Sequence, residues 1–344
     1  MDTFSPKERL QRVFQKQAVE RSPIICPGGM MNAAIVDVMN QTGHVLPKAH
    51  HTAEEMTDLA FAVQEHTGFE NFGIPFCMTV EAEALGSDID FGTLECEPKI
   101  LTERFPSVKE VSFLPEGAIT KNTRAEAIVQ SIYTLSKKYP DVPAIGSLTG
   151  PLSTAASIVD PMTFLKQLRR EKEDAHKVID YVSTQLIDYA RLMADNGAAA
   201  ISIADPTATG EILGPKFFDE YAVLYLNKVT DAIHEMGLPV IIHICGDVRM
   251  VKTGLQKLHG DALSVDAFVD LKSLKQELSG VTTMGNLSTY LLEFGSPDKV
   301  ETNVVHLLQK EIDILAPACG LSTSTPLTNI KAFTATAKEG VGYD

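Results

Sequence analysis

Long apolar segments are absent from this 344-residue chain, and none approaches the roughly 20 residues that a membrane-spanning helix needs. The N-terminal segment MDTFSPKERLQRVFQKQ is charged and amphipathic and has no apolar core, so we expect no secretory signal. Basic residues are also few, because 30 Lys and Arg stand against 45 Asp and Glu, a formal net charge of −15. That balance argues against binding to the phosphate backbone of nucleic acids. We therefore expect a soluble, cytoplasmic protein with neither a nucleic-acid nor a membrane partner.

Cysteine is scarce as well. The five cysteines are odd in number and far apart, so we expect free, metal-bound or catalytic thiols rather than a disulfide framework. No G-x-G-x-x-G follows the first apolar run, which weighs against a dinucleotide-binding fold. No H-x-H or H-E-x-x-H occurs, which counts against a zinc hydrolase. Gly/Ser linkers, low-complexity tracts and short repeats are missing too, so we expect residues 1–344 to form a single domain.

What recurs instead is a short apolar run, then a small or polar residue, then a longer helical pattern. Eight such runs occur, at residues 23–26, 71–77, 143–150, 198–206, 239–246, 262–267, 282–286 and 313–319. Runs that are apolar on both faces and alternate with helices predict a parallel sheet covered by helices, and eight of them predict a closed (β/α)8 TIM barrel of the α/β class. A doubly wound open sheet is the alternative. We also expect an N-terminal helix within residues 1–20, and an excursion, such as a hairpin, at about residues 87–120 in the second βα connection.

Polar and metal-capable side chains gather at the predicted ends of these strands. Because residues that follow the strands of a barrel line its active-site face, we expect them around one opening. They are Cys26, Cys77, Thr149, Asp205, His243 with Cys245, Asp266, Asn286 and Cys319.

The stretch PVIIHICGDV, residues 239–248, carries the strongest of these signals. His243 and Cys245 stand two residues apart, so both point to the same side of an extended segment. Imidazole nitrogen and thiolate sulfur are preferred ligands of Zn²⁺, and Cys319 at the end of the last run could supply a third. Three protein ligands leave a position open, which is the pattern of a catalytic zinc site. The alternative is a core histidine and core cysteines without a metal.

Other residues have two interpretations each. Asp266 or Asp205 could fill the fourth position or orient His243 from outside the ligand set, and Asp205 could equally be a helix-cap or turn residue. Glu81 and Glu83 could be solvated helix residues or pocket residues, and Cys26 and Cys77 could be core or pocket-wall residues. The residues that we take as candidates for a substrate or cofactor pocket are Met30, Asn32, Cys77, Thr79, Glu81, Thr149 and Asn286.

HICG, followed much later by LAPACG, resembles the His-x-Cys…Cys zinc motif of the methylcobamide:coenzyme M methyltransferases. These enzymes belong to the uroporphyrinogen decarboxylase superfamily and have a (β/α)8 barrel. The similarity extends over nearly the whole chain, through IPFCMTVEAEALG, VPAIGSLTGPLSTAAS, ISIADPTATGEILGPKFF, LSVD, GNLS and ILAPACGLSTSTPLTNIKA.

The resemblance implies that His243, Cys245 and Cys319 bind zinc and that Asp266 takes the place of an acidic residue near the metal, where relatives carry glutamate. It also implies methyl transfer between a corrinoid, carried by a small corrinoid-binding protein, and a small acceptor such as coenzyme M, activated as its zinc thiolate. Decarboxylases of the superfamily lack the triad and have an arginine-rich N-terminal segment. The corresponding CPGGMMNAAIVDVMNQTGHVLP has no arginine, which argues against porphyrinogen decarboxylation.

Other reactions remain open. The enzyme could run in the opposite direction and demethylate a methoxylated or methylated compound, with cob(I)alamin as the acceptor and zinc as a Lewis acid on the leaving atom. It could use a pterin such as tetrahydrofolate as the acceptor. A barrel that only binds a metal or a corrinoid protein is a further alternative, against which the intact triad argues.

Overall fold

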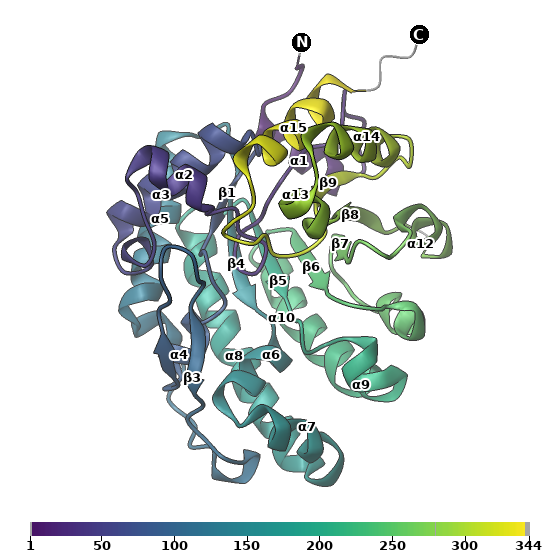
Figure 1. Ribbon diagram of the computed structural model, residues 1–344. Coiled ribbons are helices and arrows are strands. Elements are labelled where there is room, and N and C mark those ends of the chain that lie inside the picture. The colour runs from purple at the N-terminus through teal and green to yellow at the C-terminus, as the bar shows by residue number, and fades with distance from the viewer. Residues whose placement is uncertain (1, 279, 341–344) are drawn as a thin grey trace.

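The central element is a parallel sheet of seven strands in the order β1-β4-β5-β6-β7-β8-β9. The computed structural model describes residues 2–278 and 280–340. The strands are β1 (Phe72–Ile74), β4 (Ala144–Thr149), β5 (Ala200–Ala204), β6 (Val240–Ile244), β7 (Ala262–Val265), β8 (Thr282–Leu287) and β9 (Ile314–Pro317). Each pairs in parallel with its neighbour, and a helical segment follows each one, as Figure 1 shows.

The first predicted run, residues 23–26, closes this sheet into a barrel. Ile24 forms a parallel bridge with Leu315 of β9, and its carbonyl accepts a hydrogen bond from Glu70 N at 2.8 Å, just before β1. The carboxamide of Asn71 then pairs with both backbone groups of Cys26, at 2.8 and 2.9 Å, in place of a strand partner. All eight predicted runs therefore take part in the barrel, seven as strands and the first through its bridge to β9. The (β/α)8 barrel is confirmed against the open sheet.

The helices make the outer layer (Figure 1). Before β4 they are α1 (Pro6–Phe14), α2 (Val36–Thr42), the 3-10 turn η1 (Lys48–His50), α3 (Ala53–Thr67), α4 (Val80–Ala84) and α5 (Thr123–Lys138). Between β4 and β6 they are α6 (Pro151–Ile158), α7 (Pro161–Arg170), α8 (Lys172–Asp195), α9 (Gly210–Phe217), the π-helical η4 (Phe218–Val223) and α10 (Leu224–Glu235). After β6 they are η5 (Arg249–Val251), α11 (Lys252–Leu255), α12 (Leu271–Glu277), α13 (Thr289–Phe294), α14 (Pro297–Leu308) and α15 (Leu327–Glu339). None of the described helices is long and apolar enough to cross a membrane.

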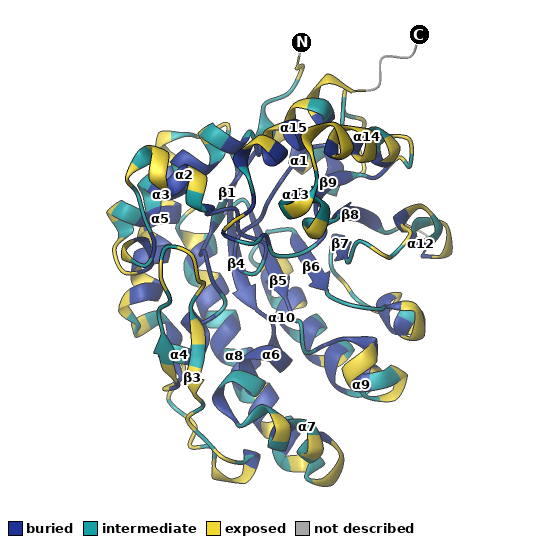
Figure 2. Cartoon of the chain, viewed as in Figure 1, coloured by how far each residue is buried: buried dark blue, intermediate teal, exposed yellow. Residues whose placement is uncertain are grey.

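Two layers of buried side chains account for the packing, and Figure 2 shows the strands buried inside the helices. The larger layer lies between the sheet and the helices and includes Ile242 and Ile244 of β6. The smaller layer fills the barrel interior with Ile241 and its counterparts on the other strands, and Leu10 and Val13 of α1 close its amino end. Because side chains alternate along a strand, His243 has the same inward direction as Ile241.

The segment between α4 and α5 contains a separate antiparallel hairpin, formed by β2 (Asp88–Asp90) and β3 (Lys99–Thr102). Two 3-10 turns, η2 (Val108–Glu110) and η3 (Ile119–Lys121), follow it. The loop of the hairpin is fixed to the chain after β9, because Thr323 Oγ1 donates to the carbonyl of Glu95 at 2.6 Å. This excursion therefore reaches the carboxyl end of the barrel.

Candidate metal centre

His243, Cys245 and Cys319 come together at the carboxyl ends of β6 and β9. His243 Nε2 lies 2.9 Å from Cys245 Sγ, and the two sulfur atoms are 3.2 Å apart. The three possible ligand atoms all lie within 4.8 Å of one another, and among the described residues this is the one such group of His, Cys, Asp and Glu. His243 is fully buried and the cysteines are partly buried. The arrangement suits a metal ion that is bound at the barrel mouth and is accessible from one side.

The second ring nitrogen of His243 has its own partner. His243 Nδ1 lies 2.9 Å from the hydroxyl oxygen of Ser264, which stands opposite His243 in the β6–β7 register. A metal-bound histidine commonly has its other nitrogen fixed in this way, which sets the tautomer and the ring orientation. Sequence reasoning missed Ser264, because ALSVD reads as an ordinary strand and only the pairing register places the serine beside the imidazole.

The two thiols have opposite pKa shifts. The hydrogen bond between them raises the pKa of Cys245, with burial and the charges of Cys319 and Asp266 adding to the shift. The same hydrogen bond lowers the pKa of Cys319 against its burial, and His243 lowers it further. These opposite shifts favour a single proton between the two sulfur atoms, on Cys245 rather than on Cys319. Replacement of that proton by a dication would relieve the repulsion between two thiolates, so these residues fit a zinc ion.

Two carboxylates lie near this cluster. Asp266, predicted as a possible fourth ligand, lies outside the three-residue group; its Oδ1 accepts a hydrogen bond from Ala267 N at 2.6 Å, and its charge acts on Cys245. Glu97, in the hairpin loop, accepts a hydrogen bond from Asn32 Nδ2 at 2.9 Å. Burial of its carboxylate, and next the charge of Cys319, raise the pKa of Glu97. Nothing in the sequence signalled Glu97, because its position depends on how the excursion folds back.

Asp205 makes the contacts of a helix-capping residue, which was its alternative interpretation from the sequence. It is fully buried, and its carboxylate accepts hydrogen bonds from Leu152 N and Ser153 N, both at 2.9 Å, and from Ser153 Oγ at 2.6 Å. These contacts satisfy the first turn of α6, as a capping residue does. Asp205 is not part of the three-residue group, so its carboxylate is committed to the helix.

One of the seven pocket candidates, Met30, contacts the cluster, and two others, Asn32 and Asn286, bind the segments that carry the two nearby carboxylates. Met30 brings its sulfur atom within 3.8 Å of Cys245 Sγ. Asn32 holds Glu97, and Asn286 donates to the carbonyls of Asp266 and Val269, both at 2.8 Å. These contacts fix the loops that carry the two nearby carboxylates.

The other four candidates, Cys77, Thr79, Glu81 and Thr149, belong to two other polar groups, one around Arg124 and one between Glu81 and Thr149. Arg124, buried at the start of α5, donates to Cys77 Sγ at 2.9 Å and to Glu83 at 2.7 Å, and it lies 3.3 Å from Thr79 Oγ1. Glu81 accepts from the backbone and hydroxyl of Thr149 at 2.8 and 3.0 Å, and burial raises its pKa. Across the described residues, no side-chain hydrogen bond links either group to the cluster. The Arg124 group joins α4 to α5, and the Glu81–Thr149 pair joins α4 to β4.

Comparison with known proteins places this chain in a family. The family model described as uroporphyrinogen decarboxylase (URO-D) matches residues 5–340. The methylcobamide:CoM methyltransferase MtbA of Methanosarcina acetivorans is 33% identical over 340 residues, which cover 98% of this chain and 99% of the relative. The methylcobamide:CoM methyltransferase MtaA of Methanosarcina barkeri is 29% identical over 98% of this chain and 99% of its own length.

Among solved structures, a methyltransferase from Methanosarcina mazei superposes with a TM-score of 0.90 at 29% identity, covering 98% of this chain and 99% of that one. The likeness thus holds over the full length in sequence and in structure. The chain belongs to the uroporphyrinogen decarboxylase (URO-D) family, in the group that contains the methylcobamide:CoM methyltransferases.

Proposed function

We propose that this protein transfers a methyl group from a methylcorrinoid to a small thiol such as coenzyme M, with Zn²⁺ bound by His243, Cys245 and Cys319. The observation that carries the proposal is the grouping of these three side chains at the barrel mouth, in a chain that matches methylcobamide:CoM methyltransferases along nearly its whole length. The corrinoid is supplied by a small corrinoid-binding protein.

A bound zinc ion would supply the Lewis acidity that turns the acceptor thiol into a thiolate, the reactive form of a thiol. Because two of the three protein ligands are cysteines, the metal would carry little net positive charge, and the acceptor sulfur would keep its nucleophilicity. This use of zinc differs from the generation of hydroxide for hydrolysis, for which histidine-rich sites are the examples.

The chain's own residues orient the ligands. Ser264 fixes the imidazole of His243 so that Nε2 faces the two sulfur atoms. Met30 covers one side of Cys245 with an apolar thioether, which helps to exclude water from the reacting sulfur. We propose Asp266 as the group that fills the fourth position when no acceptor is bound, or that stabilises the site from just outside the ligand set.

Porphyrinogen decarboxylation fits this site less well, despite the family name. The three side chains at the mouth are of the types that bind soft metals, and the loop after residue 26 brings Met30 to Cys245 and Asn32 to Glu97, with no arginine. That loop therefore supplies no cation that could hold the carboxylates of a porphyrinogen.

The test is a methyl-transfer assay with zinc-loaded protein and free methylcobalamin, in which the corrinoid spectrum is followed as candidate acceptors are added singly. Loss of the methylcobalamin spectrum on addition of coenzyme M or another small thiol would support the proposal. No reaction with any thiol, together with methylation of reduced cobalamin by a methylated or methoxylated donor, would assign the opposite direction. Reaction with tetrahydrofolate alone would assign a pterin acceptor.

A further inference from the structure

Large apolar side chains are exposed around the barrel mouth. Five consecutive βα connections, those after β4, β5, β6, β7 and β8, each contribute at least one. Examples, between 48% and 73% exposed, are Met162, Ile212, Met250, Phe268 and Tyr290. Since the connections after barrel strands all meet at the carboxyl end, these side chains surround the opening that leads to His243. Exposed apolar surface of this extent marks a face that another molecule covers.

One part of this face is hollowed. A groove of about 320 Å³ lies between α7 and α9, the helices beyond the carboxyl ends of β4 and β5 in Figure 1. Its apolar lining includes Met162, Leu165, Ile212, Leu213 and Phe217. The groove is therefore shaped for apolar side chains and is continuous with the rim of the mouth.

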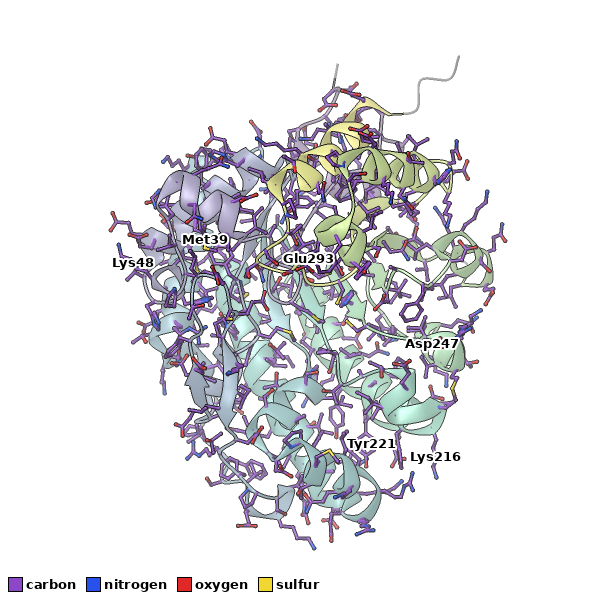
Figure 3. The ribbon with its side chains drawn as sticks, viewed as in Figure 1. Met39, Lys48, Lys216, Tyr221, Asp247 and Glu293 are labelled. Atoms are coloured by element: carbon purple, nitrogen blue, oxygen red, sulfur yellow. The ribbon has the colours of Figure 1, made fainter. Side chains whose placement is uncertain are left out.

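The charged side chains that line the groove are all basic, the reverse of the net charge of the chain. Lys166, Arg169 and Arg170 line it, no acidic residue does, and Lys216 lies on α9 beside it. Arg169 packs over the ring of Phe217, at 5.6 Å. Within the part of the chain that the structure describes, none of these four cations forms an ion pair, although many other lysines and arginines do. Lys166 and Lys216 act only at longer range, on Asp160 and Glu220, whose pKa values they help to lower. Figure 3 shows Lys216 on the same side of the molecule as Asp247, two residues beyond Cys245.

Helix ends account for part of this charge. Cations in the last turn of a helix, such as Arg169 and Arg170 of α7, are favoured by the helix dipole. That effect does not explain Lys166 in the middle of α7, nor the presence of unpaired cations on both walls of an apolar groove in a chain of net charge −15. A partner with acidic and apolar side chains would complement both properties.

We infer that the groove between α7 and α9 binds an acidic, apolar segment of the corrinoid-binding protein and so holds the corrinoid over the mouth. The inference rests on the proposed function, because only a protein-bound methyl donor would need such a surface. A symmetric contact between two copies of this chain would bring the same four cations together, which disfavours a second copy as the occupant.

The test measures methyl transfer from two different donors by a double charge-reversal variant, Lys166→Glu with Lys216→Glu. This variant changes one exposed, unpaired cation on each wall of the groove. The matched control is Arg191→Glu with Lys331→Glu, two exposed, unpaired cations on α8 and α15, outside the groove. One donor is free methylcobalamin. The other is a methylated corrinoid protein that is purified from the source cells and identified by its demethylation by the wild-type enzyme.

We expect the groove variant to raise the KM for the corrinoid protein by about tenfold or more, with turnover of free methylcobalamin unchanged. The control variant should behave as the wild type with both donors. A second variant, Ile212→Ser, should raise the same KM without a change of charge and without loss of thermal stability.

The possible negative results distinguish failure of the proposed function from failure of the docking inference. If the wild type cannot demethylate free methylcobalamin with any acceptor, the proposed function is wrong, because this donor does not need the groove. If the wild type uses both donors and the KM for the corrinoid protein is the same in the groove and control variants, the docking inference is overturned. If sedimentation shows a wild-type dimer that the groove variant splits, the groove is a contact between copies, which also overturns it.

Discussion

His243 and Ser264 are opposite each other on neighbouring strands, with the imidazole Nδ1 2.9 Å from the serine hydroxyl. This contact leaves Nε2 as the nitrogen that faces Cys245 and Cys319. The orientation of the proposed metal ligand is thus set by the register of two strands, before any metal binds.

Ser264→Ala tests that relationship. Loss of the hydroxyl frees the imidazole to rotate and to change tautomer, so we expect zinc affinity to fall by about 10- to 100-fold. Competition with a chromophoric chelator measures the affinity directly. Ser202→Ala is the matched control, since Ser202 is also a buried serine on a barrel strand, and its affinity should equal that of the wild type. Unchanged affinity in Ser264→Ala would mean that packing alone holds the ring.

The ligand set itself is tested by His243→Ala and Cys319→Ala. Each removes one of three proposed protein ligands, so both variants should lose most of their zinc on dialysis and most of their methyl-transfer activity. Cys96→Ser is the control for a cysteine change, because Cys96 is exposed and outside the cluster. Stoichiometric zinc retained in both His243→Ala and Cys319→Ala would show that the ligands are other residues.

The fold and the grouping of the three proposed ligands were predictable from the sequence for a physical reason. Strands of a covered parallel sheet are apolar on both faces, so their ends, and the residues that follow them, can be located from composition alone. The i, i+2 spacing of His243 and Cys245 then fixes their common direction. The register that pairs Ser264 with His243 and the path that brings Glu97 to Asn32 depend on tertiary packing, which leaves no local signal. Thr149 and Glu81 follow strands or lie near their ends, yet they bind each other and not the proposed metal ligands.

The shared proton of the cysteine pair predicts unequal thiol reactivity in the metal-free protein. The pKa of Cys319 is lowered by the hydrogen bond from Cys245, so its thiolate is present at a pH below the ordinary thiol range, whereas the raised pKa of Cys245 keeps that residue protonated. Because only the thiolate is alkylated rapidly, iodoacetamide should modify Cys319 before Cys245 at neutral and mildly acidic pH. Peptide mass mapping at several time points measures both rates.

Asp266→Asn provides the internal check on that experiment. The charge of Asp266 contributes to the raised pKa of Cys245, so its removal should speed alkylation of Cys245 and leave Cys319 the faster of the two. Equal rates for the two cysteines in the wild type would contradict the shared-proton description. Full protection of both thiols on addition of Zn²⁺ would connect the pair to metal binding.

Asp205→Ala separates a capping residue from a metal ligand. The substitution leaves Leu152 N and Ser153 N without their side-chain acceptor and removes one of the two acceptors of the Ser153 hydroxyl, so we expect a loss of about 3 kcal/mol in the free energy of unfolding. Zinc affinity of the folded variant should be unchanged, because the carboxylate is directed to the start of α6. Chemical denaturation measures the first quantity and chelator competition the second. Asp266→Ala is the counterpart, with little expected effect on unfolding and a reduced zinc affinity. If Asp205→Ala instead released zinc while its stability stayed at the wild-type value, this carboxylate would belong to the metal site.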